Sequence, residues 1–469
     1  MDTMAERNYR ADLREILVER FSESELRDLC FDLGIDYETL GGDNKRDKAR
    51  ELLLFGERHD RTLELFMAVN NARPGLAWSQ PPPEIVKAPR RVWPLSKGPL
   101  GSNPYTNRRA IRSPEYFFGR SYEVRTTLTL LSNLQSISLV GPRRIGKSSL
   151  LYHISDPKVL RDYAIDPDQF AFILLSCEQL SDLSRDQILQ VMLNQARAAM
   201  SKAGFRVDAG ASPNAGMTFF EYSNALAGLT QFGRKLVYLL DEFEYLARNT
   251  NLAPAFFAGL RSIANNLDVA YVTASGQDLL DLTYADKSVL GSPFFNIFSM
   301  IRLALLDDND ARDLIGGPSR AAGVEFSDAT VEFIRSLADH HPFFLQVACF
   351  HAFDLQSQKG TLTEADHRLV QGRVRDGLED HLQFAWDHLK AEERQVLSSL
   401  DTAQDDLKYF ATMKSLQNQC VICMNDNRYR LCTLWADFVK SQPPVPTAPE
   451  APGGKQERPL TAKPDDRFL

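Results

Sequence analysis

The sequence predicts a multidomain protein whose central part is an α/β fold with a parallel sheet. From about residue 113 to residue 300, segments with strand character alternate with segments of helical periodicity, as in an open sheet covered by helices. We expect strands at four apolar runs, residues 136–140, 170–176, 235–240 and 269–274. An N-terminal all-α bundle is expected before this core. A C-terminal helical domain and a winged-helix-like region are expected after it.

A glycine-containing loop stands between the first of these strands and the helix that follows it. Residues 141–148 are Gly-Pro-Arg-Arg-Ile-Gly-Lys-Ser, a complete G-x-x-x-x-G-K-S motif. A strand, a loop and a helix in this order direct backbone N–H groups at phosphate oxygens. Gly141 and Gly146 let the main chain approach the anion closely, Lys147 would reach the β- and γ-phosphates, and the Ser148 hydroxyl would bind Mg²⁺. The motif therefore predicts a P-loop NTPase core that binds ATP or ADP with Mg²⁺, although the sequence leaves GTP open. The residues of this loop expected to bind the cofactor are Gly141, Pro142, Arg143, Arg144, Ile145, Gly146, Lys147, Ser148 and Ser149.

Two carboxylates follow the third predicted strand. Asp241 and Glu242 stand directly after an apolar run, at the strand end where ligands of parallel sheets bind. Asp241 is placed to hold Mg²⁺, as Ser148 is, and Glu242 to orient or deprotonate the attacking water. The simpler alternative is that both acids only cap a helix that starts at Phe243. Beside the phosphate-binding loop, the pair favours a nucleotide hydrolase in which Lys147, Asp241 and Glu242 are catalytic.

Composition narrows the class of protein further. The chain has 469 residues, 43% of them hydrophobic, and a net charge of −8, which argues against nucleic acid as an obligatory partner. No stretch of about 18 uninterrupted apolar residues is present, so no membrane span is predicted. The start of the chain is charged, unlike a signal peptide, and six scattered cysteines fit a reducing compartment. A cytoplasmic location is expected.

The first 78 residues carry a helical pattern. Two apolar stripes at helical spacing are Leu13, Ile16, Leu17 and Phe21, then Leu26, Leu29, Cys30 and Leu33, and the pattern continues at Leu52, Leu53, Leu63, Phe66 and Val69. Ser22 followed by Glu25 predicts a capping box before the second stripe. Residues 1–78 are therefore expected to form a small helical bundle.

The remaining boundaries follow from composition. Residues 79–112 hold seven prolines and seven Lys or Arg against the single acid Glu84, which indicates an extended linker. After the core at 113–300 we expect a helical lid at 301–380 and the winged-helix-like region at 381–440. Residues 441–469, with seven prolines, are expected to be a disordered tail. A zinc site at Cys420, Cys423 and Cys432 is disfavoured, since no fourth ligand stands at normal spacing.

These motifs together resemble the bacterial AAA-like STAND ATPases, signal-transduction ATPases with numerous domains. The resemblance covers roughly residues 103–440 and is carried by Phe-Phe-Gly-Arg at 117–120, the loop at 141–148, Leu-Leu-Asp-Glu-Phe-Glu at 239–244, Ser-Pro-Phe-Phe-Asn at 292–296 and Pro-Phe-Phe-Leu-Gln at 342–346. It implies that Phe118, Gly119 and Arg120 pack near the adenine and that Ser275, ending a sensor strand, lies beside the γ-phosphate as a catalytic residue.

The same resemblance implies that Pro342 touches the nucleotide base through a Gly-x-Pro motif. Here that motif is His340-His341-Pro342, so the family's glycine is absent. The sensor strand also lacks a terminal arginine. Arg261, in the preceding helix, is the candidate for a contact from a second subunit, and its alternative is an ordinary surface residue.

The N-terminal segment resembles an effector-associated, death-like adaptor domain. The residues that carry this resemblance are 21–31, Asp36-Tyr37, Arg73-Pro74 and Trp78. It implies recruitment of a separate effector protein through a matching domain. The alternative is a structural bundle that docks on the ATPase.

Together the resemblances imply an ATP-binding, slowly hydrolysing signalling switch that self-associates and recruits an effector, with bacterial defence as the expected setting. One alternative is a DNA-binding, origin-recognition-like AAA+ ATPase that uses a winged helix. Residues 381–440 contain seven Lys or Arg and eight Asp or Glu, which is a poor electrostatic footprint for DNA. Another alternative is a scaffold that binds nucleotide without turnover.

Overall fold

The computed structural model describes residues 13–32, 35, 37, 40, 44–58, 65, 68–69, 103–105, 109–202, 216–231, 233–279, 282, 293–425 and 428–443. The chain divides into two compact units, one ending at Val374 and one beginning at Arg375, and each is described by itself. Several predictions lie outside the described residues: those on Leu33, Asp36, Leu63, Phe66, Arg73-Pro74, Trp78 and Ser292, most of the linker at 79–112, and the tail beyond residue 443.

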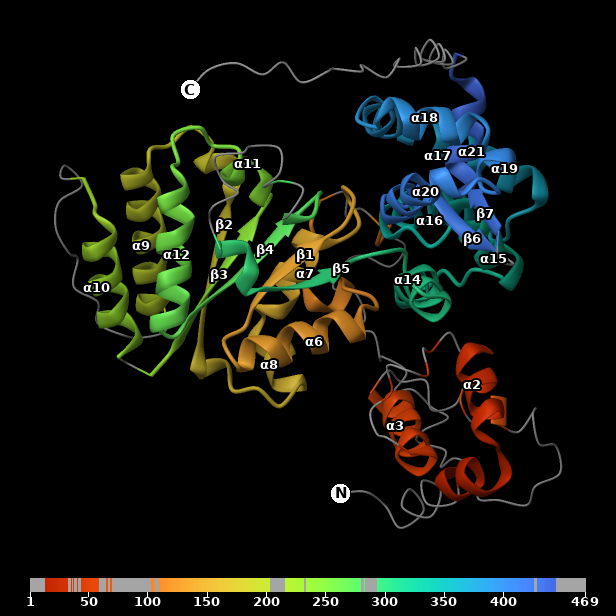
Figure 1. Ribbon diagram of the computed structural model, residues 1–469. Helices are drawn as coiled ribbons and strands as arrows, with labels where there is room; N and C mark the ends of the chain where they lie inside the picture. The colour runs from red at the N-terminus through yellow and green to blue at the C-terminus, as the bar shows by residue number, and fades with distance from the viewer. Residues whose placement is uncertain are drawn as a thin grey trace, which may run out of the picture. The chain divides into compact units, whose positions relative to one another are not determined.

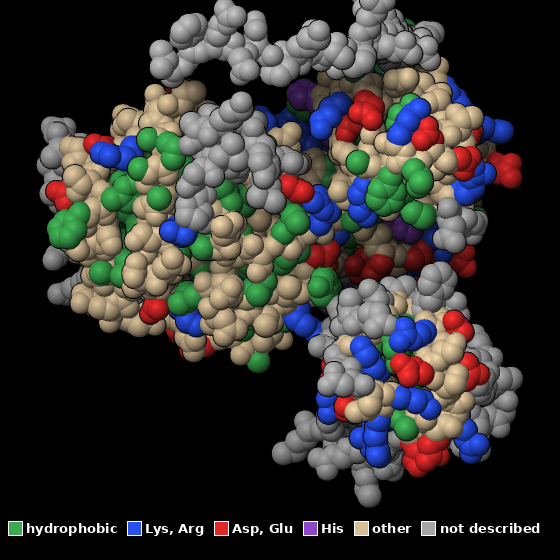
Figure 2. Space-filling model, in the orientation of Figure 1, with side chains coloured by type: hydrophobic (Ala, Val, Ile, Leu, Met, Phe, Trp, Pro, Cys, Tyr) green, Lys and Arg blue, Asp and Glu red, His purple; other side chains and the backbone are tan. Residues whose placement is uncertain are grey.

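The N-terminal segment folds into helices around an apolar core. Helical residues 13–20 are followed by α2 (Glu23–Asp32) and α3 (Lys45–Arg58). The predicted capping box is confirmed, because Ser22 N–H donates to Glu25 Oε2 at 2.7 Å and Glu25 N–H donates to Ser22 Oγ at 3.2 Å. The buried side chains are Leu13, Leu17, Phe21, Leu26, Leu29, Cys30, Ile35, Tyr37, Leu40, Ala49, Leu52, Leu53, Leu65 and Val69. Charged side chains of both signs are interspersed on the face of this bundle seen in Figure 2.

The core is a five-stranded parallel sheet with the strand order β2-β3-β4-β1-β5. Its strands are β1 (Ser136–Val140), β2 (Phe170–Ser176), β3 (Lys235–Asp241), β4 (Val269–Ser275) and β5 (Phe298–Arg302). All four predicted strands are present, and β3 and β4 each extend one residue further than predicted.

The fifth strand, β5, was missed because it lacks a continuous apolar run. Ile301 is its one buried residue, and the side chain of Met300 is 58% exposed. An edge strand packs on only part of its surface, so its sequence need not be apolar throughout. The sheet therefore ends at Arg302, two residues beyond the limit that we expected for the core.

Helices cover both faces of the sheet (Figure 1). On one face lie α9 (Arg185–Lys202), α10 (Phe219–Thr230) and α12 (Pro254–Asn266), and on the other α6 (Ser121–Ser132), α7 (Lys147–Ile154) and α8 (Pro157–Asp162). Short elements complete the core: η2 (Pro114–Tyr116), η3 (Pro167–Gln169), η4 (Cys177–Leu180), α11 (Phe243–Ala247) and η5 (Pro293–Ile297). Covered in this way, β1 and β4 are buried along their whole length.

Three helices that pack on one another follow the sheet. They are α14 (Asp308–Ala321), α15 (Asp328–Ala338) and α16 (Pro342–Lys359). The side chains of Asp307 and Ser327 cap the first two by accepting backbone N–H groups of Asp310 and Thr330. The next helix, α17 (Glu364–Asp387), contains both the division between the two units and the boundary that we predicted at residue 380.

The second unit consists of short helices and one hairpin. Its elements after α17 are α18 (Ala391–Ser398), α19 (Leu400–Ala403), η6 (Leu407–Tyr409), α20 (Phe410–Asn418), β6 (Ile422–Asn425), β7 (Arg428–Leu431) and α21 (Thr433–Ser441). The two strands pair antiparallel, with Ile422 opposite Leu431. Helices followed by a hairpin agree with a winged helix, which stays a prediction.

Two kinds of structural feature, a membrane-spanning helix and a cluster of metal ligands, are absent from the described residues. No described helix is long and apolar enough to cross a membrane. In the same part of the chain, no group of three or more His, Cys, Asp or Glu side chains is arranged to hold a metal ion.

Candidate nucleotide-binding site

The predicted phosphate-binding loop connects β1 to α7. Gly141 N–H donates to the Ser275 carbonyl at 3.3 Å, which fixes the start of the loop against β4. A Cβ on Gly141 would lie 2.7 Å from the Leu303 carbonyl oxygen, so no side chain fits there. Gly146 has φ +107° and caps α7, a backbone conformation that other residues rarely adopt. Glycine is thus required at these two positions for different reasons. Gly141 leaves room for a close approach of the backbone, and Gly146 adopts a left-handed backbone conformation.

Lys147 lies within this loop. Its Nζ donates to the carbonyl oxygens of Gly141 at 2.7 Å and Pro142 at 2.9 Å. Burial lowers the pKa of Lys147, while the negative charges of Glu244 and Asp241 act in the opposite direction. The nearby carboxylates thus offset part of the effect of burial, because they favour the charged form of the Lys147 ammonium group.

Asp241 and Glu242 lie at the carboxyl edge of the sheet. Asp241 ends β3 in register with Ser176 of β2, and its Oδ1 accepts the Glu242 backbone N–H at 3.1 Å. Glu242 is the N-cap residue of α11 by position, with φ 55°, but its side chain makes no capping hydrogen bond. Helix capping therefore accounts for the place of Glu242 at the start of α11, but it does not account for a role of the Glu242 side chain.

The electrostatic environment of Glu242 suits a base. Burial raises the pKa of Glu242, and the neighbouring charges of Asp241, Glu178 and Glu244 raise it further. A carboxylate with a raised pKa accepts a proton more readily near neutral pH. Sequence analysis did not assign Glu178 or Glu244, although Glu244 belongs to the segment 239–244 on which the resemblance rests. In the structure, Glu244 Oε2 is buried and makes no hydrogen bond.

The sensor strand β4 lies between β1 and β3, so Ser275 stands between the loop and the Asp241 strand. Ser275 pairs in register with Val140, directly before the loop. Its hydroxyl donates to the Gln277 carbonyl at 2.6 Å. Ser275 thus ends β4 next to the start of the loop, its side chain bonds within the turn after the strand, and its place beside the γ-phosphate stays a prediction.

The segment before α6 contacts both α7 and the phosphate-binding loop, and its packing near the adenine stays a prediction. The Phe117 ring stacks on His153 of α7 with 4.0 Å between ring centroids, and Phe118 is buried. Arg120, only 7% exposed, donates from Nη2 to the Ile145 carbonyl of the loop at 3.4 Å. The guanidinium group bonds to protein atoms, which the sequence pattern did not indicate.

Pro342 begins α16, and Phe343 beside it contacts the loop. The Arg144 guanidinium carbon lies 4.4 Å from the centroid of the Phe343 ring, a cation–π arrangement. His340, which replaces the family's glycine, has φ 63°, a conformation that glycine adopts without strain. His340 thus stands in a left-handed backbone conformation that residues other than glycine rarely adopt.

Several contacts of the site were not foreseen. The Ser149 hydroxyl accepts the Ile111 backbone N–H at 2.9 Å, so this predicted cofactor-binding side chain also anchors the chain before the core. Arg302, at the end of β5, donates to both carboxylate oxygens of Asp278 at 2.6 and 2.7 Å. Arg261 is half-buried on α12, and its role in a second-subunit contact stays a prediction.

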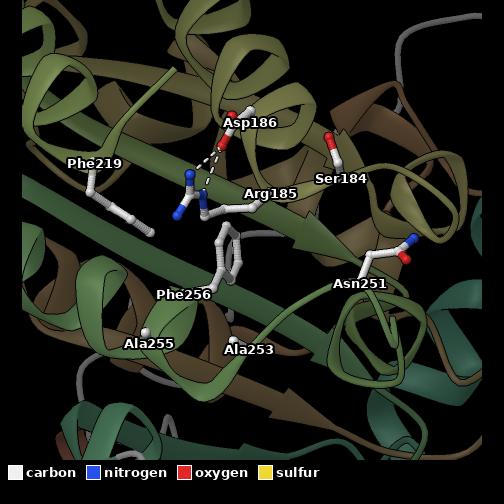
Figure 3. A pocket seen from close by; sticks show the side chains of 8 residues that line it. All are labelled: Ser184, Arg185, Asp186, Phe219, Asn251, Ala253, Ala255 and Phe256. Atoms are coloured by element: carbon white, nitrogen blue, oxygen red, sulfur yellow. Dashed lines mark hydrogen bonds and ion pairs between the residues drawn. The ribbon is translucent and has the colours of Figure 1, made fainter. Parts of the chain in front are cut away.

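A separate pocket of about 330 Å³ lies between α9, α10 and α12 (Figure 3). Its lining residues are Ser184, Arg185, Asp186, Phe219, Asn251, Ala253, Ala255 and Phe256. The figure shows the Arg185–Asp186 ion pair beside the two phenylalanine rings. None of the predicted site residues lines this pocket, so it is distinct from the phosphate-binding loop.

Asp310, on the first turn of α14, is a half-buried carboxyl group that contacts the segment before α6. Its Oδ2 accepts the Arg120 backbone N–H at 3.1 Å. The pKa of Asp310 is raised to about 6, chiefly by burial and then by the charges of Asp307 and Glu123, against the opposing effect of the Arg120 backbone N–H and charge. Between about pH 4 and 6 the folded protein therefore holds a proton that the unfolded chain releases.

Stability should consequently fall as the pH rises through this window, by up to about 2 kcal/mol from this group. Asp310→Asn does not titrate, so its thermal midpoint should rise relative to that of the wild type between pH 4.5 and pH 7. Thermal unfolding of both proteins at a series of pH values measures the difference. Parallel pH profiles of the two midpoints would contradict the prediction.

The five-stranded sheet, the loop after β1 and the acids after β3 define a P-loop nucleoside triphosphatase fold. The chain belongs to the Novel STAND NTPase 2 family, whose model matches residues 130–405. Residues 13–74 match Effector-associated domain 7. The chain is therefore a nucleotide-binding STAND NTPase with an N-terminal effector-associated domain.

Solved structures show the same fold. A Walker-type ATPase of Pyrococcus abyssi is 17% identical with a TM-score of 0.52, over 72% of this chain and 99% of that protein. The ORC2 protein of Aeropyrum pernix, in ADPNP and ADP complexes, is 13% identical with a TM-score of 0.50, over 72% of this chain and 95% of that protein. No curated protein sequence matched.

Proposed function

We propose that the chain binds ATP at the loop and hydrolyses it slowly, as a regulatory step. The observation that supports this most directly is the placement of Lys147 in the loop with Asp241 and Glu242 at the adjoining edge of the sheet. Lys147 would leave the loop carbonyls for the β- and γ-phosphates, and Glu242 would take the proton of the attacking water.

The donor set at this edge fits Mg²⁺. Magnesium takes oxygen ligands and usually combines one or two carboxylates with phosphate oxygens and water. Here Ser148, at the start of α7, and Asp241 would hold it. The lack of a larger acidic or histidine cluster among the described residues fits a metal that the nucleotide helps to bind. The bound ion would neutralise charge on the phosphates.

The proposed switch rests on contacts between the loop and the helices after the sheet. Arg144 of the loop lies over Phe343 of α16, and the Leu306 N–H donates to the His340 carbonyl at 3.0 Å. A nucleotide can shift an equilibrium only through contacts that differ between states. The γ-phosphate, present in ATP and absent from ADP, supplies that difference at Lys147 and the sensor strand.

The proposed output is self-association, which clusters the effector-associated domains. Clustering would let each domain recruit a separate effector protein through a matching, death-like domain. We place this signalling in the cytoplasm and in bacterial defence, since the chain carries an effector-associated domain on a STAND NTPase. The amount of effector retained by the full chain with ATP and with ADP tests this part.

Light scattering of the purified protein tests the assembly step. The wild type should grow in mass with a non-hydrolysable ATP analogue and not with ADP, and the Lys147→Ala variant should grow with neither. A mass that never responds to nucleotide would contradict nucleotide-gated assembly and favour a static scaffold.

The second candidate function is a DNA-acting, origin-recognition-like ATPase. The likeness to the ORC2 structure and the hairpin after α20 favour it. The near-balanced charge of residues 381–440 opposes it, because DNA-binding faces carry an excess of Lys and Arg. Binding to duplex DNA that weakens steeply with added salt would support this function.

A further inference from the structure

Arg120 contacts three segments that are far apart in the sequence. Its Nη1 lies 3.1 Å from Glu123 Oε1 on α6. Its Nη2 donates to the Ile145 carbonyl in the phosphate-binding loop at 3.4 Å and also to the Ala304 carbonyl, in the chain that leaves β5 toward α14. Arginine presents its donors in a rigid planar fork, so one guanidinium group can hold several acceptors in a fixed relation.

Because the Arg120 side chain is buried, its hydrogen bonds matter for the stability of its charged group. Arg120 is 7% exposed, and an unpaired charge at such a position costs several kcal/mol. Because Nη2 serves both carbonyls, a movement of Ile145 changes the geometry of the bond to Ala304. The loop and the exit from the sheet are thus connected through a single nitrogen atom.

The backbone of the same residue is connected to α14. Arg120 N–H donates to Asp310 Oδ2 at 3.1 Å. Gly119 makes this approach possible, since a Cβ on it would lie 2.1 Å from the same oxygen. Gly119 and Arg120 both have positive φ, at 68° and 61°, so the turn that presents this N–H is a specific backbone conformation. Side chain and backbone of Arg120 therefore hold opposite ends of the segment 304–310.

We propose that Arg120 is a positioning residue that couples the conformation of the phosphate-binding loop to the position of α14. This inference rests on the proposed function, because it assumes that nucleotide at the loop changes the helices after the sheet. Arg120 acts through Ile145 and Ala304, while Lys147 and the loop N–H groups contact the phosphates. Loss of the guanidinium group should uncouple the position of α14 from the nucleotide that is bound at the loop.

Hydrogen exchange of the full chain, followed by mass spectrometry, tests this coupling. In the wild type, exchange of α14 amides (Asp308–Ala321) should differ between ADP and a non-hydrolysable ATP analogue. At nucleotide concentrations that saturate Arg120→Gln, its α14 exchange should no longer depend on which nucleotide is bound. Arg120→Lys should restore part of the difference, because lysine keeps the charge but not the fork.

Two further variants complete the test. Arg161→Gln removes an exposed arginine on α8 and should behave as the wild type. Gly119→Ala adds a Cβ against Asp310, and it should abolish the α14 response with the guanidinium present. If Arg120→Gln does not fold by circular dichroism, the lysine and Gly119→Ala variants decide the question.

Three results would overturn the coupling. One is a full nucleotide response of α14 in the foldable Arg120 variants and in Gly119→Ala. Another is loss of nucleotide binding in folded Arg120→Gln, which would make Arg120 a binding residue. The third is a wild type that binds both nucleotides without any change in α14. Failure of the wild type to bind nucleotide at all would instead contradict the proposed function.

Discussion

Replacement of Lys147 by alanine should weaken ATP binding by about 100-fold or more. Charge-assisted hydrogen bonds to phosphate contribute about 1.5–3 kcal/mol each, and about 3 kcal/mol corresponds to 100-fold in affinity. The Lys147 ammonium group is held within the loop by the Gly141 and Pro142 carbonyls. Alanine removes the charge and leaves those carbonyls facing the phosphates, so the remaining loop N–H groups would bind ATP weakly.

Equilibrium binding of a fluorescent ATP analogue measures this effect. The matched control is Lys158→Ala, since Lys158 is exposed on α8 and its removal changes the net charge equally. An affinity of Lys147→Ala within about threefold of that control would show that the nucleotide binds elsewhere. A loss shared by both variants would indicate a general effect of charge.

Glu242→Gln should retain ATP binding and lose turnover by about 10²–10⁴-fold. Glutamine has the shape of glutamate and cannot accept the proton of the attacking water. Burial and three neighbouring acids raise the pKa of Glu242, so this carboxylate suits the base role, and amide substitution also relieves repulsion by Asp241. We therefore expect ATP affinity equal to or tighter than that of the wild type.

Phosphate release at saturating ATP measures the turnover. Asp268→Asn provides the control, because it makes the same change of carboxylate to amide on an exposed residue before β4. Undiminished hydrolysis by Glu242→Gln would sink the assignment of the base. Glu244, whose Oε2 atom is buried and whose charge acts on Glu242, would then be the residue to replace next.

Much of the core could be predicted because its signals are local. Buried parallel strands are apolar along most of their length, so the runs of the inner strands β1, β3 and β4 stood out, and the edge strand β2 carries a similar apolar run. The edge strand β5 carries Ser299, Met300 and Arg302 toward partly open surroundings and shows no such run. Its presence follows from pairing with β1, a long-range contact that sequence periodicity does not encode.

The candidate site likewise contains some residues that could be predicted from the sequence and others that could not. The loop and the acids after β3 are recognisable because their chemistry requires particular residue types at fixed spacing. Asp310 could not be recognised as a site residue from the sequence. Acidic residues are common in the first turn of any helix, because the helix dipole favours them there. Its contact with Arg120, 190 positions earlier, exists only in the folded chain. The same holds for Ser149 with Ile111 and for Arg144 with Phe343.

The most direct test of the central claim, that the bound nucleotide sets the assembly state, is the mass of the Glu242→Gln protein over time after addition of ATP and Mg²⁺. If ATP drives assembly and hydrolysis reverses it, the variant should form a large species that persists while the wild type returns to its starting mass as ATP is consumed. A variant that binds ATP yet keeps the mass of its ADP-bound form throughout would contradict the claim.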